Sequence, residues 1–332
     1  MTLIPYEPPF KITKKILTLV AEISEMVGQI SGDRGAVGDV WLRRRNQILT
    51  IQSSLAIERN SLSVDEVTEV INGKRVVGDP EDILEVQNAY QVYERLLEFD
   101  PYSLTDLLKA HQILMAGLIK ESGQLRSVGV GVFGANHVVH HIAPPPGMVP
   151  KLVDDLLNWG RESDVHPLIK SSVTHYELEF IHPFVDGNGR LGRLWQTLIL
   201  SQWRPFFACI AIETLVFEYV EEYYEALNKA EKNGESTIFI EFTLKIIFNS
   251  LKRFVKDTAT RAKITPQIQL LLTALGEETL SAKRLLERMN LTHRQHFMNM
   301  YLKPALALGV IEMTRPEQPT SRLQKYRRVI KL

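Results

Sequence analysis

The sequence predicts a mostly α-helical protein with one β-hairpin near its middle and a small second domain at its C-terminal end. Apolar residues recur at spacings of three and four along most of the chain, as they do on amphipathic helices. The glycine- and valine-rich stretch 126–143 breaks that pattern and predicts two strands around a turn. The polar segment 256–265 ends before Pro266 and predicts a linker between the two domains.

The composition is that of an ordinary globular protein of about two domains. The chain has 332 residues, and its 39 lysines and arginines balance its 39 acidic residues, so no overall field attracts nucleic acid or a membrane surface. Its single cysteine, Cys209, excludes an internal disulfide, and we expect a buried, inert thiol. We find no signal peptide and no apolar run of membrane-spanning length, which favours a cytoplasmic location without membrane contact.

Residues 1–75 predict an N-terminal helical region. A proline-rich arm precedes a first amphipathic helix, and a second helix is expected from Val37 to Ile51. Beyond it, Ser54 and Glu58 are spaced so that both side chains lie on one side of a helix. This spacing alone is a weak signal, because most such glutamates are surface residues.

Residues 76–258 predict the main domain. Helices are expected at 81–98, after Ser103, and at 149–159, 167–180, 214–229 and 238–255, with the hairpin between the second and the third. His111 lies on an apolar helix face and is interpreted as a core histidine. A metal site at His137, His140 and His141 is not favoured, because neighbouring strand residues point to opposite faces and no acidic or cysteine partner accompanies them.

The stretch from Ile181 to Arg193 carries the chemistry. An apolar helix ends at a histidine and a proline, and a glycine-rich turn then opens another helix, which is a ready anion site. Asp186 can hold Mg²⁺ through one oxygen, and His182 can accept a proton near neutral pH. These are the parts needed for transfer from a nucleotide phosphate. The alternative is a structural glycine loop that caps a helix.

These residues resemble the signature of the Fic family (filamentation induced by cyclic AMP), H-P-F-x-[DE]-G-N-[GK]-R-x-x-R, at every specified position. The resemblance implies transfer of AMP from ATP, with Mg²⁺, to a Ser, Thr or Tyr hydroxyl of a target protein. It implies His182 as the general base and Asp186 as the magnesium ligand. The other residues that it places at the nucleotide are Gly187, Asn188, Gly189, Arg190 and Arg193. The first three donate main-chain amides, and Asn188 also its side chain, to developing charge, while the arginines hold the departing pyrophosphate.

Beside that signature, Ser54 and Glu58 resemble the family's inhibitory motif, [ST]-x-x-x-E-[GN]. The resemblance implies an ion pair between Glu58 and Arg193 that keeps ATP in an unproductive pose. Arg59 stands where the pattern has Gly or Asn, and we expect it either to compete for Glu58 or to alter the helix end.

Two further elements are similar to parts of Fic proteins. The hairpin 126–143 resembles the flap on which a target protein docks by strand pairing, and the resemblance places Val130 and Phe133 of this flap at the nucleotide. Tyr223 and Tyr224 match a Y-Y-x-x-L element that borders the adenine, although Glu231 stands where Asn is common.

Residues 266–332 predict three helices and a hairpin, which is a winged-helix pattern. The expected third helix exposes polar residues able to meet bases or phosphates, so DNA binding through 292–328 is one hypothesis and a protein-binding or dimer module is the other. These polar residues are His293, Arg294, Gln295, His296 and Asn299. The N-terminal arm and the helical tail favour a homodimer.

Other functions stay open at this point. The same loop could remove AMP, with Glu58 orienting a water molecule. Kinase activity ranks low, because family members that phosphorylate tend to carry Lys at the position of Gly189. The non-enzymatic alternative is a DNA-binding regulator whose Fic core senses nucleotide.

Overall fold

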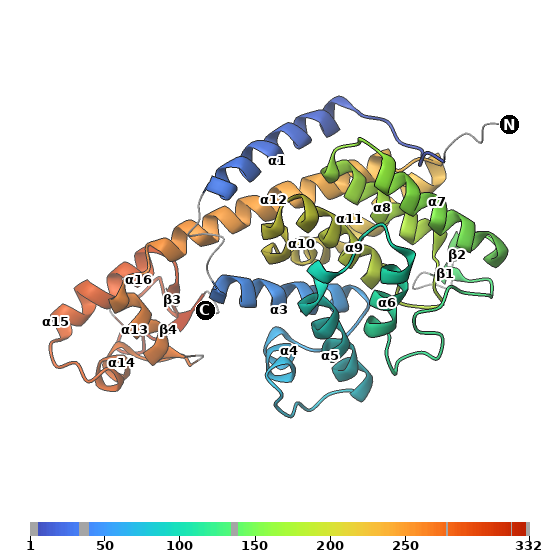
Figure 1. Ribbon diagram of the computed structural model, residues 1–332. Helices are drawn as coiled ribbons and strands as arrows, with labels where there is room; N and C mark the ends of the chain where they lie inside the picture. Colours follow the sequence, from blue (N-terminus) through green and yellow to red (C-terminus); the bar gives the residue numbers. More distant parts are fainter. Residues whose placement is uncertain (1–5, 33–39, 134–138, 277, 320, 330–332) are drawn as a thin grey trace. The chain divides into compact units, whose positions relative to one another are not determined.

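Helices make up most of the computed structural model, which describes residues 6–32, 40–133, 139–276, 278–319 and 321–329 (Figure 1). The mainly α fold class is therefore confirmed. The chain divides into two units, Met1–Lys252 and Arg253–Leu332. Within the described residues, no helix is both long enough and apolar enough to cross a membrane.

Local capping explains where several helices of the first unit begin. Ser63 forms a capping box with Glu66, and Ser103 accepts a hydrogen bond from the Asp106 N–H. The helices are α1 (Lys14–Gly32), α3 (Val40–Ile57), α4 (Val64–Ile71), α5 (Pro80–Glu94), η1 (Leu96–Glu98), α6 (Leu104–Leu114), η2 (Pro146–Met148), α7 (Val149–Glu162), α8 (Pro167–Ile181), α9 (Asn188–Trp203), η3 (Pro205–Cys209), α10 (Ile212–Glu218), α11 (Val220–Asn233) and α12 (Thr237–Ala262).

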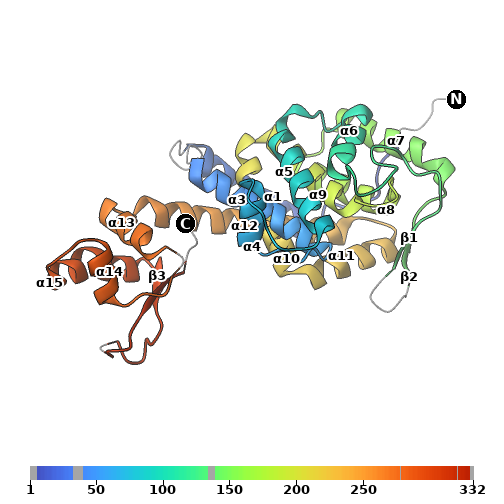
Figure 2. The same cartoon turned by 90° about the horizontal axis from the view of Figure 1, so that it is seen from below.

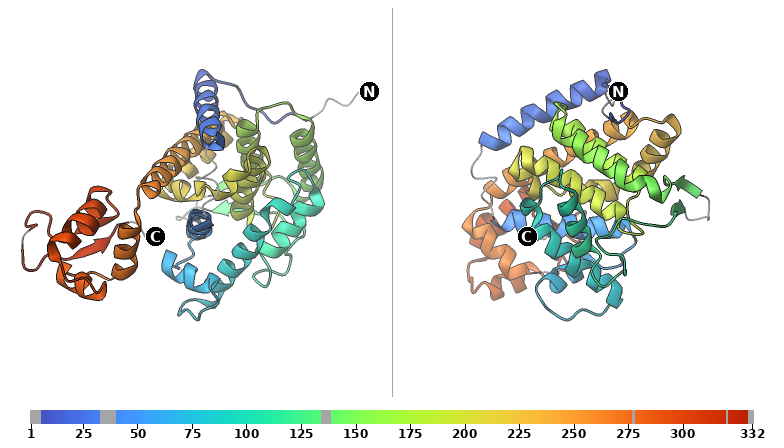
Figure 3. Two further views of the ribbon diagram at one scale, coloured as in Figure 1. Left: turned by 60° about the vertical axis from the view of Figure 1, so that its left-hand side comes forward. Right: turned by 45° about the vertical axis from the view of Figure 1, so that its right-hand side comes forward.

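The pair α8 and α9 forms the centre of this unit. Nearly every residue of both helices is buried, and Trp195 of α9 is fully buried with its indole N–H bonded to the Pro101 carbonyl at 2.8 Å. The helix α3 packs against α10 and reaches α9, and Figure 3, left, shows it almost end-on among these helices. The antiparallel strands β1 (Gly131–Phe133) and β2 (Val139–Ile142) project from one end of the unit (Figure 2). Residues 134–138, including His137, lie outside the described residues.

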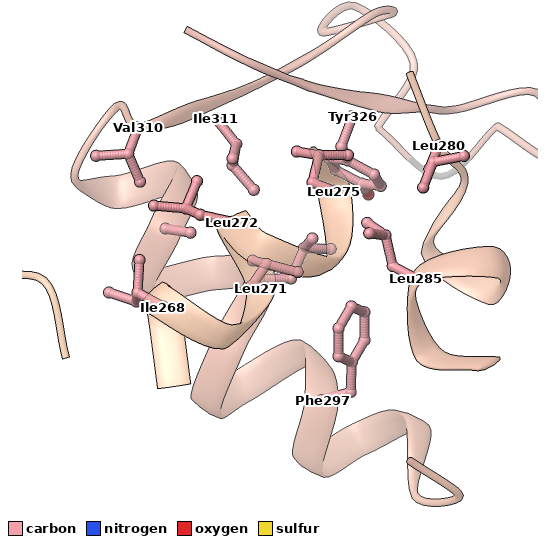
Figure 4. Close-up of a cluster of buried hydrophobic side chains, with 12 residues drawn as sticks. Ile268, Leu271, Leu272, Leu275, Leu280, Leu285, Phe297, Val310, Ile311 and Tyr326 are labelled. Carbon is pink, nitrogen blue, oxygen red and sulfur yellow. The ribbon is translucent and has the colours of Figure 1, made fainter. Parts of the chain in front are cut away.

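The second unit has its own core (Figure 4), built from α13 (Pro266–Leu275), α14 (Ala282–Arg288) and a longer helical segment. That segment consists of α15 (Arg294–Phe297), the π-helical η4 (Met298–Leu302) and α16 (Lys303–Ala307). The π turn comes just before Pro304, which has no N–H to continue the helical ladder. The strands β3 (Ile311–Met313) and β4 (Tyr326–Arg328) close the unit as an antiparallel pair.

Three expectations from the sequence need correction. The helix expected to end at residue 255 continues as α12 to Ala262, so most of the segment 256–265 expected as a linker is helical. The single helix expected at 214–229 is divided into α10 and α11 at Tyr219. Cys209 is half-buried and not buried, although burial still raises the pKa of its thiol, as suits an unreactive cysteine.

The N-terminal arm is bound to the first unit through its backbone and side chains. The Pro9 carbonyl accepts the Ser236 N–H at 2.9 Å, and the Phe10 ring packs edge-on against Trp159 with centroids 6.4 Å apart. The Tyr6 hydroxyl donates to Glu177 of α8 at 2.9 Å. Burial raises the pKa of Glu177 from 4.5 to about 7, although the hydrogen bond from Tyr6 works in the opposite direction.

Because the folded state holds the Glu177 proton more tightly than the unfolded chain, this group's stabilising effect is complete below about pH 4.5 and is lost as the pH rises to about 7. The Glu177→Gln variant has no carboxyl group to titrate. We therefore predict that its free energy of unfolding, measured relative to wild type, is about 3 kcal/mol higher at about pH 8 than at about pH 5. Urea unfolding at the two pH values measures it, with Glu222→Gln on the exposed face of α11 as the control. An equal pH dependence in wild type and Glu177→Gln would contradict the assignment.

Candidate active site

The turn 182–187 between α8 and α9 has an unusual backbone. His182 ends α8 with φ 50° and ψ 62°, and Gly187 precedes α9 with φ 83°. The left-handed region costs a non-glycine residue about 1–2 kcal/mol, so other contacts must hold His182 in it. Asn188 supplies two of them to the turn, because its side chain accepts the Phe184 N–H and donates to the Phe184 carbonyl, both at 2.9 Å.

Asn188 therefore has a structural role in the turn. Its side-chain oxygen and one of its two amide hydrogens are bonded to Phe184, and its expected contact with developing charge on a phosphate stays a prediction. The main-chain N–H groups of the first turn of α9, by contrast, have no acceptor inside the helix and can bind an anion there.

Arg126, which the sequence did not single out, holds the outside of the turn. Its Nε donates to the His182 carbonyl at 2.7 Å, and its Nη1 and Nη2 donate to the carbonyls of Val128 at 2.9 Å and Pro144 at 2.6 Å. Its main-chain N–H also bonds the Pro183 carbonyl at 2.9 Å. One buried guanidinium therefore ties the turn to both ends of the hairpin.

His111 of α6 holds the inside of the turn. Its ring stacks on Phe184 at 3.6 Å between centroids, and its Nδ1 accepts the Gly123 N–H at 2.9 Å. The other nitrogen, Nε2, must then carry the proton and donates to the Asp186 carbonyl at 2.9 Å. Burial lowers the pKa of His111 to about 4, so it stays neutral. The interpretation as a core histidine is confirmed, and this histidine also fixes the loop.

The carboxylate of Asp186 lies at the surface, beside the start of α9. Its Oδ1 accepts the Gly187 N–H at 2.6 Å, and its Oδ2 lies 3.3 Å from Arg190 Nη2. The side chain is 58% exposed, so it is open to a ligand from solution. Arg190 is buried, and its Nη1 is paired with Glu85 of α5, a residue that the sequence did not single out.

Arg193 is bound by the last turn of α3. Its Nη2 lies 2.8 Å from Glu58 Oε1 and 2.9 Å from the Ser54 carbonyl, while its Nε donates to Ser54 Oγ at 3.0 Å. Burial alone would lower the pKa of Arg193, but the charge of Glu58 outweighs it and raises that pKa. The ion pair expected between Glu58 and Arg193 is present in the structure.

Comparisons with known proteins agree with this geometry. A model of the Fic/DOC family matches residues 101–200, and a model of the C-terminal domain of filamentation-induced-by-cAMP, Fic-like proteins matches residues 266–328. The crystal structure of a Fic family protein from Desulfovibrio desulfuricans G20 is 45% identical in sequence, with a TM-score of 0.74, and the match covers 98% of this chain and 99% of that one. The chain belongs to the Fic family.

Two curated relatives carry a named activity. The protein adenylyltransferase Fic of Nematostella vectensis is 28% identical over 219 residues, which are 63% of this chain and 48% of the relative. A probable protein adenylyltransferase of Aquifex aeolicus (strain VF5) is 30% identical over 184 residues, 54% of each protein. This Fic protein thus spans about half the length of the curated relatives that it matches.

A buried polar network joins α8, α9 and α11 next to the turn. The Tyr223 hydroxyl donates to Glu179 Oε1 at 3.2 Å and lies 3.1 Å from His175 Nε2, and His175 Nδ1 lies 2.8 Å from Gln196 Oε1. Tyr223 is 1% exposed, so it is part of this network and not of an open surface. Tyr224, at 42% exposure, is the tyrosine of the pair that reaches the surface, with its hydroxyl 3.5 Å from the Ile57 carbonyl.

The flap residues are only partly described. Val130 directly precedes β1 and Phe133 ends it, with a register shift between Val132 and Phe133. Their contact with a nucleotide stays a prediction. In the second unit, the segment 292–328 contains α15 to α16 and both strands, and Arg327 is paired with Glu312 across the hairpin. DNA binding through this segment, its winged-helix character and a homodimer also stay predictions.

Arg59, which stands where the inhibitory motif has Gly or Asn, has a left-handed backbone. It follows α3 with φ 73°, and the next N–H, of Asn60, closes the helix on the Leu55 carbonyl at 3.1 Å. A left-handed residue just after a helix is usually Gly or Asn, which is the choice in the family pattern. Glu58 is paired with Arg193, and among the described residues no ion pair joins it to Arg59, so the structure favours an altered helix end over competition for the carboxylate.

We predict that Arg59→Gly stabilises the protein by about 1 kcal/mol, because glycine removes the Cβ strain of the left-handed position. Urea unfolding at neutral pH measures the change. The matched control is Arg59→Ala, which removes the same charge but keeps the Cβ atom. A similar gain in both variants would show that the charge of Arg59, and not its backbone, is responsible.

Proposed function

We propose that this Fic protein transfers AMP from ATP to a Ser, Thr or Tyr hydroxyl of a target protein. One observation carries the proposal: a single turn brings His182, Asp186, Arg190 and Arg193 together at the amino end of α9. The named activity of the relatives supports the same reaction.

The proton transfer follows from the placement of His182. Its Nδ1 lies 3.3 Å from the Glu179 carbonyl, an acceptor, so Nδ1 carries the proton and Nε2 carries the lone pair. Nε2 then accepts the proton of the target hydroxyl. The hydroxyl oxygen forms a bond to the α-phosphorus, and the bond from that phosphorus to pyrophosphate breaks. The amides at the start of α9 and the two arginines stabilise the negative charge that moves onto the phosphates.

The site also suits Mg²⁺. Among the described residues, no group of three or more His, Cys, Asp or Glu side chains would hold a metal by itself. Magnesium is commonly bound through one or two carboxylates, with water and nucleotide phosphates as the other ligands, and Asp186 offers one exposed carboxylate beside the anion site. Bound there, Mg²⁺ would neutralise charge on the phosphates.

We infer that Glu58 inhibits the transfer. Glu58 and Ser54 occupy Nε and Nη2 of Arg193, so this arginine has little left to offer the terminal phosphate of ATP. The target segment, in this proposal, pairs along the hairpin 126–143, whose two described strands form a sheet in which each strand has one edge without a strand partner.

Removal of AMP is a second candidate. The carboxylate of Glu58 lies directly against Gly189, where even a Cβ atom would collide with it. It therefore stands at the anion site and could orient a water molecule toward a bound AMP ester. This function predicts that wild type removes AMP from a modified protein and that the Glu58→Gly variant does not.

We predict that Glu58→Gly modifies itself or an added target with AMP far more than wild type does when given Mg²⁺ and ATP, because Arg193 is released. Intact-mass analysis detects the added AMP. The double variant Glu58→Gly/His182→Ala should lose a factor of about 10²–10⁴ in rate, the usual contribution of a general base. Transfer at the undiminished rate in the double variant would remove His182 from the mechanism.

We further predict that Asp186→Ala in the Glu58→Gly protein raises the Mg²⁺ concentration for half-maximal transfer by at least about tenfold, because the site loses its one exposed carboxylate. A titration with MgCl₂ at fixed ATP measures it. An unchanged magnesium requirement would exclude Asp186 as the ligand.

A further inference from the structure

The buried guanidinium of Arg190 is held by carboxylates at two of its three nitrogens. Its Nη1 is paired with Glu85, its Nη2 lies 3.3 Å from Asp186 Oδ2, and its buried Nε has no hydrogen-bond partner among the described residues. A buried donor without an acceptor is uncommon and indicates a ligand oxygen that binds there. Nucleotide phosphate is the ligand that the neighbouring amides of α9 suit.

The two arginines of the signature are therefore held differently. Arg193 uses Nε and Nη2 on Ser54 and Glu58, the donors through which a guanidinium binds a phosphate side-on. The Nε of Arg190 has no partner among the described residues, so Glu85 fixes this arginine through Nη1 and does not occupy Nε. Glu58 and Glu85 thus form similar ion pairs with opposite expected effects on transfer.

Glu85 itself is firmly placed. It lies within α5, its side chain is 14% exposed, and its second oxygen accepts a hydrogen bond from Asn60 Nδ2 at 2.8 Å. Asn60 is buried and also donates to the Asp82 carbonyl at 3.1 Å. The carboxylate that meets Arg190 is therefore fixed by the fold, whereas the Asp186 side chain is 58% exposed.

We propose that Glu85 is a positioning residue for the transfer reaction: it holds Arg190 away from a full ion pair with Asp186, and so keeps the Asp186 carboxylate available for Mg²⁺. At 3.3 Å, the contact between Arg190 and Asp186 is loose compared with the pairing to Glu85. Without the charge of Glu85, the buried guanidinium of Arg190 has Asp186 as its remaining acidic partner. A cation must then compete with Arg190 for the Asp186 carboxylate. This inference rests on the proposed function.

The test compares Glu85→Gln with its parent in the Glu58→Gly background. Glutamine keeps the length of the side chain and an oxygen for the Asn60 hydrogen bond, but it removes the charge that Arg190 pairs with. Two quantities are measured across a MgCl₂ series: the rate of AMP transfer, and the affinity for a non-hydrolysable ATP analogue by calorimetry. The matched control is Glu81→Gln, an exposed glutamate on the same helix.

We expect Glu85→Gln to need about tenfold more Mg²⁺ than its parent for half-maximal transfer, and about tenfold more for the half-maximal gain in analogue affinity. Such a change is typical when a residue that orients a metal ligand is lost. High Mg²⁺ should largely restore the rate, which a general loss of folding would not allow. Glu81→Gln should match the parent. If Glu85→Gln does not fold, Glu85→Asp gives the same comparison, because its shorter side chain withdraws the carboxylate from Arg190.

An unchanged Mg²⁺ requirement in both measurements would overturn the proposal. So would increased transfer by Glu85→Gln in a protein that retains Glu58, since Glu85 would then be a second inhibitory residue. If the Glu58→Gly parent transfers no AMP at all, the proposed function fails, while the Mg²⁺ dependence of analogue binding still decides the role of Glu85.

Discussion

The backbone of the turn 182–187 is the constraint on which the rest of the structure depends. A left-handed histidine followed by a glycine-led helix start exposes polar main-chain groups inside a packed protein. Side chains from elsewhere satisfy them: Arg126 from the start of the hairpin, His111 from α6 and Asn188 from α9. The helical packing therefore serves to bring these distant groups to one short loop.

The two buried arginines of α9 impose the second constraint. A buried guanidinium needs acceptors for its charge and its N–H groups; Arg126 bonds to main-chain carbonyls, whereas Arg190 and Arg193 are each paired with a glutamate. The element that supplies the partner decides the consequence. Glu58 directly follows the last residue of α3, where the chain leaves the helix, and Glu85 comes from within α5. A partner at a helix end can be withdrawn by local unwinding, and a partner inside a helix cannot.

The sequence predicted contacts that depend on local spacing or on a family motif, and it missed the other contacts that join distant segments. The signature residues, the caps at Ser63 and Ser103 and the pairing of Glu58 with Arg193 were all foreseeable from short motifs. Glu85 lies 105 positions from Arg190, and nothing in its own helix distinguishes it from an ordinary surface glutamate. Tyr223 and Tyr224 look equivalent in the sequence, but neighbouring helix positions face different directions, so one is buried and the other exposed. The end of α12 was expected too early, because the polar residues 256–262, which include no Gly or Pro, suit an exposed helix as well as a loop.

The energies at the end of α3 show how the contact between Glu58 and Arg193 can be released. Hydrogen bonds to a charged group contribute about 1.5–3 kcal/mol each when buried, but the Glu58 side chain is 32% exposed, which weakens its share. The left-handed Arg59 adds about 1–2 kcal/mol of strain immediately beyond it. The contact between Glu58 and Arg193 is thus opposed by strain at the same helix end, whereas Asn60 bonds that end to the fixed Glu85. A change of a few kcal/mol at this junction is enough to shift the balance between the paired and the released Arg193.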